Sequence, residues 1–238
     1  MLENIKQFYG IKLGATDGPI GHVKDFYFDD QTWAVRYLVV DTGSWLPGRQ
    51  VLLTPHAFQN HSLEKSGAEL DVLPVKLTRQ QIEDSPSIDS HRPVSRQYEE
   101  EYYAYYGWPN YWDGGMWSLA SGPVMIPPPI AESLPPHGQN QSDDIHLRST
   151  KSVTGYHIQA TDGQIGSVSS FMVESESWEI REWVVEAGHW YAGKTVSLRS
   201  QHVTRISYED SMVFVDLTKE DIEKTTRSDA TQVGVEHR

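Results

Sequence analysis

The chain contains one segment twice, and this repeat limits its fold more than any other feature. Residues 15–53 align with residues 160–198 without a gap at a constant offset of 145, and 17 of the 39 aligned residues are identical. The endings also match, because VKLTRQQIED (75–84) aligns with VDLTKEDIEK (215–224) at an offset of 140. A repeat of this quality predicts two copies of one structural unit.

The residues that the two copies share are of the kinds that form turns and cores. The principal shared positions are Asp17, Gly18, Gly21, Trp33, Arg36, Gly43 and Trp45, and their counterparts Asp162, Gly163, Gly166, Trp178, Arg181, Gly188 and Trp190. Asp-Gly pairs favour turns, and a glycine inside a strand, such as Gly21, indicates a bulge or a sharp bend. Val23 and Phe26 lie three residues apart, which also implies a bulge if both face the core. The repeat therefore predicts a scaffold and not a reaction centre.

Each copy contains five or six short segments rich in β-branched and aromatic residues, with turn signals between them. This pattern predicts a small antiparallel barrel, whose closure would remove exposed sheet edges. Thr78 precedes Gln81 by three residues, and Thr218 precedes Asp221 in the same way, as residues that cap a helix N-terminus do. We therefore expect a mainly β chain with two small antiparallel barrels, each followed by a short helix.

The expected domain boundaries follow from the repeat. They are a first barrel at 1–84, a connector at 85–150, a second barrel at 151–226 and a tail at 227–238. The connector has no counterpart in the repeat and contains an aromatic-rich part, 98–117, and a part rich in Pro, Gly and Ser, 118–150. The second part is typical of a flexible linker.

The aromatic-rich part holds nine Tyr or Trp in twenty residues, whereas disordered linkers are depleted in aromatics. The nine are Tyr98, Tyr102, Tyr103, Tyr105, Tyr106, Trp108, Tyr111, Trp112 and Trp117. Three interpretations stay open: packing on or between the barrels, an exposed surface for a partner or for self-association, and stacking on a ligand. Residues 97–106 fit a short helix with Tyr98, Tyr102, Tyr105 and Tyr106 near one face, which Gly107 and Pro109 would end.

Composition excludes several classes of function. The net charge is −13, and no Lys or Arg lies between Arg96 and Arg148, so a nucleic-acid interface is disfavoured. The chain has no Cys, which rules out disulfides and thiolate chemistry. No stretch approaches the length of apolar sequence that spans a bilayer, and the N-terminus lacks a signal-peptide core. We expect a cytoplasmic protein that is not inserted in a membrane.

Candidate chemical sites are weak. No pair of the ten histidines has metal-ligand spacing such as HExxH, so we interpret them as exposed loop residues. The acidic clusters at 29–30, 99–101 and 143–144 lack calcium-loop spacing and are interpreted as solvated surface charge. No nucleophile elbow, catalytic triad or paired catalytic carboxylates can be found. The expectation is a non-enzymatic protein with no metal and no cofactor.

Arg36 and Arg181 lie at equivalent positions among apolar residues of a predicted strand. A strand arginine of this kind usually pairs with a nearby carboxylate. Asp25 is a candidate partner for Arg36, although the second copy has Ser170 at the position of Asp25. A structural ion pair is favoured over the anchoring of a ligand.

The residues from Gly10 to Leu53 closely resemble the PRC-barrel domain. The resemblance rests on ATDG-x-IG, DFYFDD, W-x-VRYLVV-D-TG and WLPGR, followed by the V-x-LT ending. The second copy, 155–224, is more divergent: it keeps ATDGQIG and R-x-WVVEAG but has ESE in place of FDD. This family includes the cytoplasmic part of the photosynthetic reaction-centre H subunit and the ribosome-maturation factors.

The resemblance implies non-catalytic docking or assembly. The leading hypothesis is a tandem PRC-barrel module for protein–protein interaction, with a protein partner or a second copy of the chain in a homodimer. One alternative is a peripheral component of a photosynthetic or respiratory electron-transfer complex at a membrane, by analogy with the H subunit. Another is a small-ligand or metal-binding module. Fold alone does not transfer any of these functions.

Overall fold

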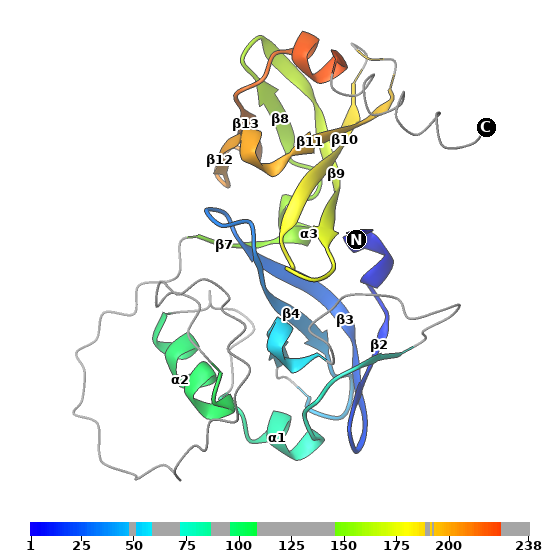
Figure 1. The fold of residues 1–238 in the computed structure, drawn as a ribbon, viewed down its shortest axis with the longest axis vertical. Coiled ribbons are helices and arrows are strands. Elements are labelled where there is room, and N and C mark those ends of the chain that lie inside the picture. The colour runs from blue at the N-terminus through cyan, green and yellow to red at the C-terminus, as the bar shows by residue number, and fades with distance from the viewer. Residues whose placement is uncertain are drawn as a thin grey trace.

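The structure is a computed structural model that describes most of the chain. The described residues are 1–47, 51–58, 72–86, 96–108, 146–188, 191 and 193–224. They form a mainly β fold with two sheets. In Figure 1 the two sheets lie one above the other along the longest axis, with the N-terminus near their junction.

The elements follow the order of the repeat. The first repeat contains β1 (Leu2–Asn4), η1 (Ile5–Phe8), β2 (Lys12–Ala15), β3 (Gly18–Asp29), β4 (Val35–Asp41), β5 (Val51–Leu53), η2 (Pro55–Ala57), β6 (Val72–Pro74) and α1 (Arg79–Glu83). The connector contributes α2 (Arg96–Tyr106). The second repeat contains β7 (Leu147–Ser149), α3 (Thr150–Val153), β8 (His157–Ala160), β9 (Gly163–Glu174), β10 (Ile180–Ala187), β11 (Thr195–Arg199), η5 (Ser200–His202), β12 (Val203–Ser207), β13 (Met212–Val215) and a final helix at 219–224.

Both sheets follow the same path. The strand order is β5-β4-β3-β2-β6 in the first and β11-β10-β9-β8-β13-β12 in the second. Neighbours along these paths are antiparallel, except that β2 pairs with β6, and β8 with β13, in parallel. The predicted closure into barrels is not seen in the hydrogen bonding of the described residues, where each path keeps two separate ends.

The register of the two sheets agrees even at their irregularities. Tyr37 pairs with Tyr27 in the first sheet, and Glu182 pairs with Met172 at the equivalent place in the second. Both long hairpins, β3–β4 and β9–β10, have register shifts at matching positions. One shift inserts an extra residue in β3 and leaves both Val23 and Phe26 in the core, 1% and 0% exposed. The bulge predicted from their spacing is confirmed.

Gly21 and Gly166 are needed because the next strand passes very close to them. Their φ angles are +139° and +159°, and an added Cβ would lie 2.1 Å from the Asp41 carbonyl oxygen and 2.0 Å from that of Glu186. Any other residue at these positions would collide with backbone. The sequence predicted a bulge or bend here, whereas the structural cause is the approach of β4 and β10.

The short helices after the last strand of each repeat are present as predicted. At α1 the Thr78 side chain accepts from the Gln81 backbone N–H, and the Gln81 side chain accepts from the Thr78 backbone N–H. In the second repeat the same exchange joins Thr218 and Asp221, at 3.1 and 3.2 Å. Capping boxes therefore begin both helices.

The shared turn aspartates hold these helices in place. The Arg79 backbone N–H donates to Asp17 Oδ1 at 2.7 Å, and the Lys219 backbone N–H donates to Asp162 Oδ1 at 3.0 Å. A carboxylate at this end of a helix satisfies a free N–H and interacts favourably with the helix dipole. The ATDG segment is thus both a turn and a helix cap.

An Asp162→Ala variant is expected to lower the free energy of unfolding by about 1 kcal/mol, the usual effect of losing a capping side chain. Asp162→Asn, which keeps an acceptor oxygen, should lose less. Urea denaturation would measure both, with Glu209→Ala in an exposed turn as the control. Equal stability of Asp162→Ala and Glu209→Ala would contradict this role of the turn.

The two repeats exchange strands. β1 of the first repeat pairs with β9, with Leu2 opposite Glu174, and β7 pairs with β3, with Leu147 opposite Asp29. These two pairings are equivalent under the offset of 145. Residues 146–150, which the expected boundaries assign to the connector, thus complete the first sheet with β7. Each sheet contains a strand from beyond its own repeat, an arrangement typical of domain-swapped dimers.

The hairpin tips also meet in a symmetric way. Ala34 and Glu179, at equivalent positions, form an isolated antiparallel bridge. Beside it the Val35 N–H donates to the Trp178 carbonyl, and the Ile180 N–H donates to the Trp33 carbonyl, both at 2.8 Å. The two repeats are therefore related by an approximate two-fold axis that passes near this bridge.

Trp33 and Trp178 extend from these tips into the opposite repeat. Trp178 lies 5.2 Å from Phe58 of the first repeat, and Trp33 lies 5.7 Å from Trp183 of the second, measured between ring centroids. Both tryptophans have left-handed backbone, with φ of 63° at Trp33 and 58° at Trp178. This conformation costs of order 1 kcal/mol or more in a residue with a side chain, and the buried ring contacts offset that cost. One hydrophobic core spans both repeats.

Candidate functional site

The aromatic connector forms a helix on the first repeat. Helix α2 spans Arg96–Tyr106, which confirms the helix predicted for 97–106. Gly107 ends it with φ of 67°, donating to the Ala104 carbonyl, while the Trp108 N–H donates to the Tyr103 carbonyl at 3.0 Å. This is the Schellman arrangement, which needs a residue that tolerates left-handed backbone. Pro109 lies outside the described residues.

The buried side of α2 differs in part from the prediction. Glu99, Tyr102, Tyr103 and Tyr106 follow helical spacing and face the first sheet, where Tyr102 and Tyr103 are 1% and 3% exposed. The predicted face contained Tyr105 in place of Tyr103. Tyr105 instead faces solvent and is 42% exposed. Packing on the sheet, one of the three interpretations left open, accounts for Tyr102 and Tyr103.

The surface beneath α2 is an apolar patch on the outer side of the first sheet. Tyr37, Val39 and Leu52 form a small hydrophobic cluster with Tyr102 and Tyr103, separate from the main core. The Tyr102 hydroxyl donates to the Leu52 carbonyl, on the edge strand β5. The helix therefore covers a sheet face that would otherwise expose large apolar side chains.

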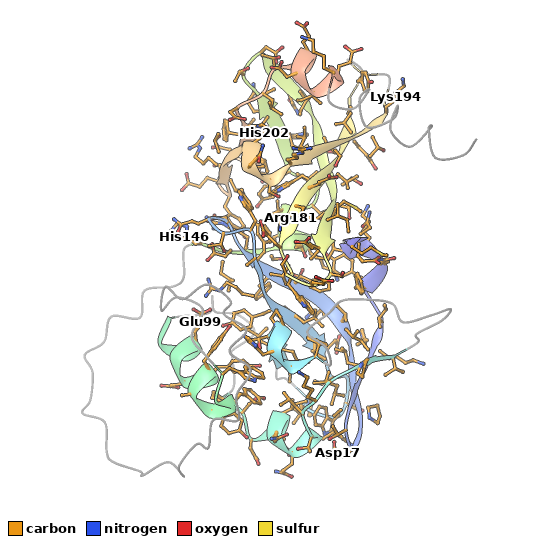
Figure 2. All side chains as sticks on the ribbon, viewed as in Figure 1. Asp17, Glu99, His146, Arg181, Lys194 and His202 are labelled. Carbon is orange, nitrogen blue, oxygen red and sulfur yellow. The ribbon has the colours of Figure 1, made fainter. Side chains whose placement is uncertain are left out.

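A buried ion cluster holds α2 on this patch. Arg36 Nη1 donates to Asp29 Oδ2 at 3.1 Å, and Arg36 Nη2 donates to Glu99 Oε1. The Tyr37 hydroxyl also donates to Glu99, at 2.8 Å. The Arg36 and Glu99 side chains are 3% and 0% exposed, and Figure 2 shows Glu99 on α2 where the helix meets the first sheet. A buried charge of this kind needs both its ion partner and its hydrogen bonds.

The expected ion pair of Arg36 is confirmed, but the partner named from the sequence is wrong. Asp25 instead accepts from the Ser149 and Thr150 hydroxyls, at 2.5 and 2.9 Å, and from the Lys151 backbone N–H. Arg36 occupies a bulge of β4, which turns its side chain toward Asp29 and α2. Asp25 faces the start of α3 and binds the other repeat.

Tyr37 and Tyr103 remain neutral at the contact between α2 and the first sheet. Burial raises the pKa of Tyr37 well above 10.0, and the neighbouring Tyr103 and Glu99 raise it further, against the opposing effect of Arg36. Burial likewise raises the pKa of Tyr103 above 10.0, again with Glu99 adding to the effect. Both hydroxyls therefore remain protonated near neutral pH, where Tyr37 acts as a hydrogen-bond donor.

The C-terminal end of α2 presents aromatic rings at the surface. The rings of Tyr106 and Trp108 stack with centroids 4.4 Å apart and an interplanar angle of 15°. The Tyr105 and Tyr106 hydroxyls donate to the Gln81 carbonyl of α1, at 3.1 and 3.4 Å. Trp108 also contacts His56 of η2, with ring centroids 6.0 Å apart. The end of α2 is thus fixed to both α1 and η2.

Tyr111, Trp112 and Trp117 lie outside the described residues, as does the side chain of Tyr98. Among the shared repeat positions, the same holds for Trp190. Trp45 is half-buried, with the Arg79 guanidinium 4.6 Å from its ring centroid.

The equivalent arginine of the second repeat has different surroundings. Arg181 Nη2 lies 2.6 Å from Glu174 Oε2, and Arg181 Nη1 lies 2.8 Å from Glu179 Oε1. Glu174 is the counterpart of Asp29, so this ion pair belongs to both repeats. The Arg181 side chain is 46% exposed, against 3% for Arg36. Helix α2 makes the difference, because it covers only the first repeat in the described part of the chain.

Two expectations about charged residues need correction. Asp29 and Glu99, which were assigned to solvated clusters, are buried. Four of the five described histidines do not lie in loops, since His22 and His157 are in strands and His56 and His202 are in short helical turns, whereas His146 lies in a turn before β7 as expected. The signal for Asp29 was present in the sequence: an acid precedes the shared arginine by seven residues in both copies.

The described residues contain no group of three or more His, Asp or Glu side chains placed to hold a metal ion. Within the same residues, no helix has the length and apolar character required to cross a bilayer. No protein-family model matches the chain. No curated protein matches it either.

Proposed function

We propose that this chain is a non-enzymatic docking module built from two PRC-barrel-type repeats, and that the aromatic end of α2 contacts a partner protein or a second copy of the chain. The two repeats form the scaffold that holds α2. The partner-binding residues are Tyr105, Tyr106 and Trp108, which we call the α2 tip.

The observation that carries this proposal is the exposure of Tyr105 on a firmly held helix. Tyr105 is 42% exposed, while Glu99 and Tyr102 on the same helix are buried in the ion cluster and the apolar patch. Tyr and Trp are enriched at the centres of protein interfaces. Anchoring lowers the entropy that these rings would lose on binding, which favours association.

The residues shared by the repeats support a structural role for the rest of the chain. Asp17 caps a helix, Gly21 allows close backbone approach, Trp33 joins the two repeats, and Arg36 binds carboxylates. Each has a purpose in building the fold. Specific function is then expected in the segment that the repeats do not share, which begins with α2.

A Tyr105→Ser variant is expected to reduce the recovery of partner proteins from native cells, or self-association of the purified chain, by about tenfold. Quantitative affinity capture and light scattering after size exclusion would measure these two quantities. The variant loses the Tyr105 hydrogen bond to Gln81 but should keep its fold, because Glu99, Tyr102 and the Tyr106 hydroxyl still hold α2.

Tyr208→Ser is the matched control, because Tyr208 has the same exposure of 42% and lies on the second repeat. Substitution of Tyr102 or Tyr103 would test folding instead of binding. The proposal fails if the wild type, Tyr105→Ser and Tyr208→Ser recover the same partners and have the same oligomeric state.

A further inference from the structure

The second sheet has an outer face equivalent to the one that α2 covers. Glu182, Val184 and Ser197 occupy the positions of Tyr37, Val39 and Leu52, with the same strand register. Among the described residues no helix lies on this face, and all three side chains are half-exposed. We call these three residues the second docking face.

A hollow of about 190 Å³ adjoins this face, lined by Ser197, Leu198, Arg199, His202, Leu217 and Ile222. The first repeat has Leu52, Leu53, Thr54, Ala57, Leu77 and Ile82 at the equivalent positions. There the space beside Leu52 is taken by aromatic residues of α2. The hollow in the second repeat thus corresponds to a place that tyrosine and tryptophan rings occupy in the first.

The chemistry of the hollow suits an aromatic side chain with a polar end. Leu198 and Leu217 contribute apolar lining, and Arg199 contributes a donor. His202 also lines the hollow, with its Nδ1 2.9 Å from Asp216 Oδ1. An arginine beside a ring can also contribute a cation–π contact. Ser197 pairs with Val184 in the same register as Leu52 with Val39. The Ser197 carbonyl therefore has the position from which the Leu52 carbonyl accepts the Tyr102 hydroxyl.

The charge on the second docking face differs from that on the patch of Tyr37, Val39 and Leu52 beneath α2. Where Tyr37 donates to Glu99, the second repeat has Glu182, which accepts from the Ser197 hydroxyl. Arg199 lies opposite Glu182 in the register of β10 and β11 but forms no ion pair with it in the described part of the chain. Arg181 already contacts two carboxylates. A helix bound here would need a cation where α2 has Glu99, because an acid would face Glu182.

We propose that the second docking face binds a helix of a partner protein that carries Lys or Arg and, three residues later, Tyr or Trp. The basic residue pairs with Glu182, and the aromatic residue enters the hollow beside Ser197. The net charge of −13 favours the approach of a basic partner over a second copy of this acidic chain. This surface is distinct from the α2 tip, so its failure would leave the proposed function intact.

The test uses the full chain and two synthetic helices, held helical by a lactam bridge at solvent-facing positions. One has the sequence of residues 96–108, and the other has the same sequence with Glu99→Lys. Calorimetry is expected to show that the lysine peptide binds about tenfold more tightly than the unchanged peptide, because an attractive contact with Glu182 replaces a repulsive one. A further Tyr102→Ala change in the lysine peptide should abolish its binding.

Charge reversal on the protein locates the site. Glu182→Lys is expected to reverse the preference, so that the unchanged peptide binds more tightly. Glu209→Lys, in an exposed turn of the same repeat, makes the same change in net charge and should leave the preference as in the wild type. The proposal is overturned if neither peptide binds, or if the preference is the same in Glu182→Lys as in Glu209→Lys.

Discussion

A Trp178→Ala variant is expected to lose about 3–5 kcal/mol of unfolding free energy, the usual cost of removing a large buried aromatic side chain. Trp178 is 1% exposed and belongs to the second repeat, yet its ring packs on Phe58 of the first. The loss should therefore destabilise both repeats and not one. Urea denaturation followed by tryptophan fluorescence and by circular dichroism would measure it, and the two signals should change together.

Both repeats are expected to unfold in a single transition, because neither repeat is complete alone. β1 adds to the second sheet and β7 to the first, so separation of the repeats removes one strand from each sheet. One hydrophobic core also contains residues of both. A structure that shares strands and core in this way unfolds as one cooperative unit.

Two variants separate the contributions to this result. Trp178→Gly removes the same ring but relieves the left-handed backbone at φ of 58°, so it should be more stable than Trp178→Ala by about 1 kcal/mol. Trp45→Ala removes a half-buried tryptophan away from the junction and should cost less. A loss in Trp178→Ala no larger than that in Trp45→Ala would contradict the role of Trp178 between the repeats.

Local features of the fold could be predicted from the sequence. The repeat, the short terminal helices, the Thr78–Gln81 capping box and the bulge near Val23 all depend on residues close together in the chain. Their physical causes, capping and the two-residue period of strands, operate over a few residues. For this reason sequence patterns describe them well.

The exchange of β1 and β7 could not be predicted in the same way. Each strand has only three residues, and nothing in such a short segment indicates which sheet it will join. A weak signal existed, because Leu2, Lys6 and Gly10 match Leu147, Lys151 and Gly155 at the offset of 145. That match extends the repeat unit upstream, but only the structure shows that each extension crosses to the other repeat.

The burial of Glu99 was missed for a related reason. Three consecutive acids in the segment at 99–101 are typical of a solvated surface, and periodicity alone did not identify the buried side of α2. The partner, Arg36, lies 63 residues away in sequence. A pairing over this distance depends on the tertiary position of α2, which the sequence pattern does not determine.

Glu99→Ala is expected to lower the free energy of unfolding by about 3–5 kcal/mol, because it leaves the buried Arg36 with fewer partners. The Tyr37 hydroxyl would lose its acceptor in the same variant. Helix α2 should then detach more readily and expose the apolar patch of Tyr37, Val39 and Leu52. Urea denaturation would measure the loss, and faster hydrogen exchange in α2 would show where it occurs.

The control on the same helix is Glu101→Ala, because Glu101 is exposed, and its effect should be within about 0.5 kcal/mol. The triple variant Asp29→Asn, Arg36→Met and Glu99→Leu tests the cause of the loss. It removes all three charges of the cluster, and the amide oxygen introduced by Asp29→Asn can still accept from the Gln31 and Thr32 N–H groups. It should recover much of the stability, since no buried charge is then left uncompensated. If the triple variant is as unstable as Glu99→Ala, the loss comes from packing, and the ion cluster is not what holds α2 on the first sheet.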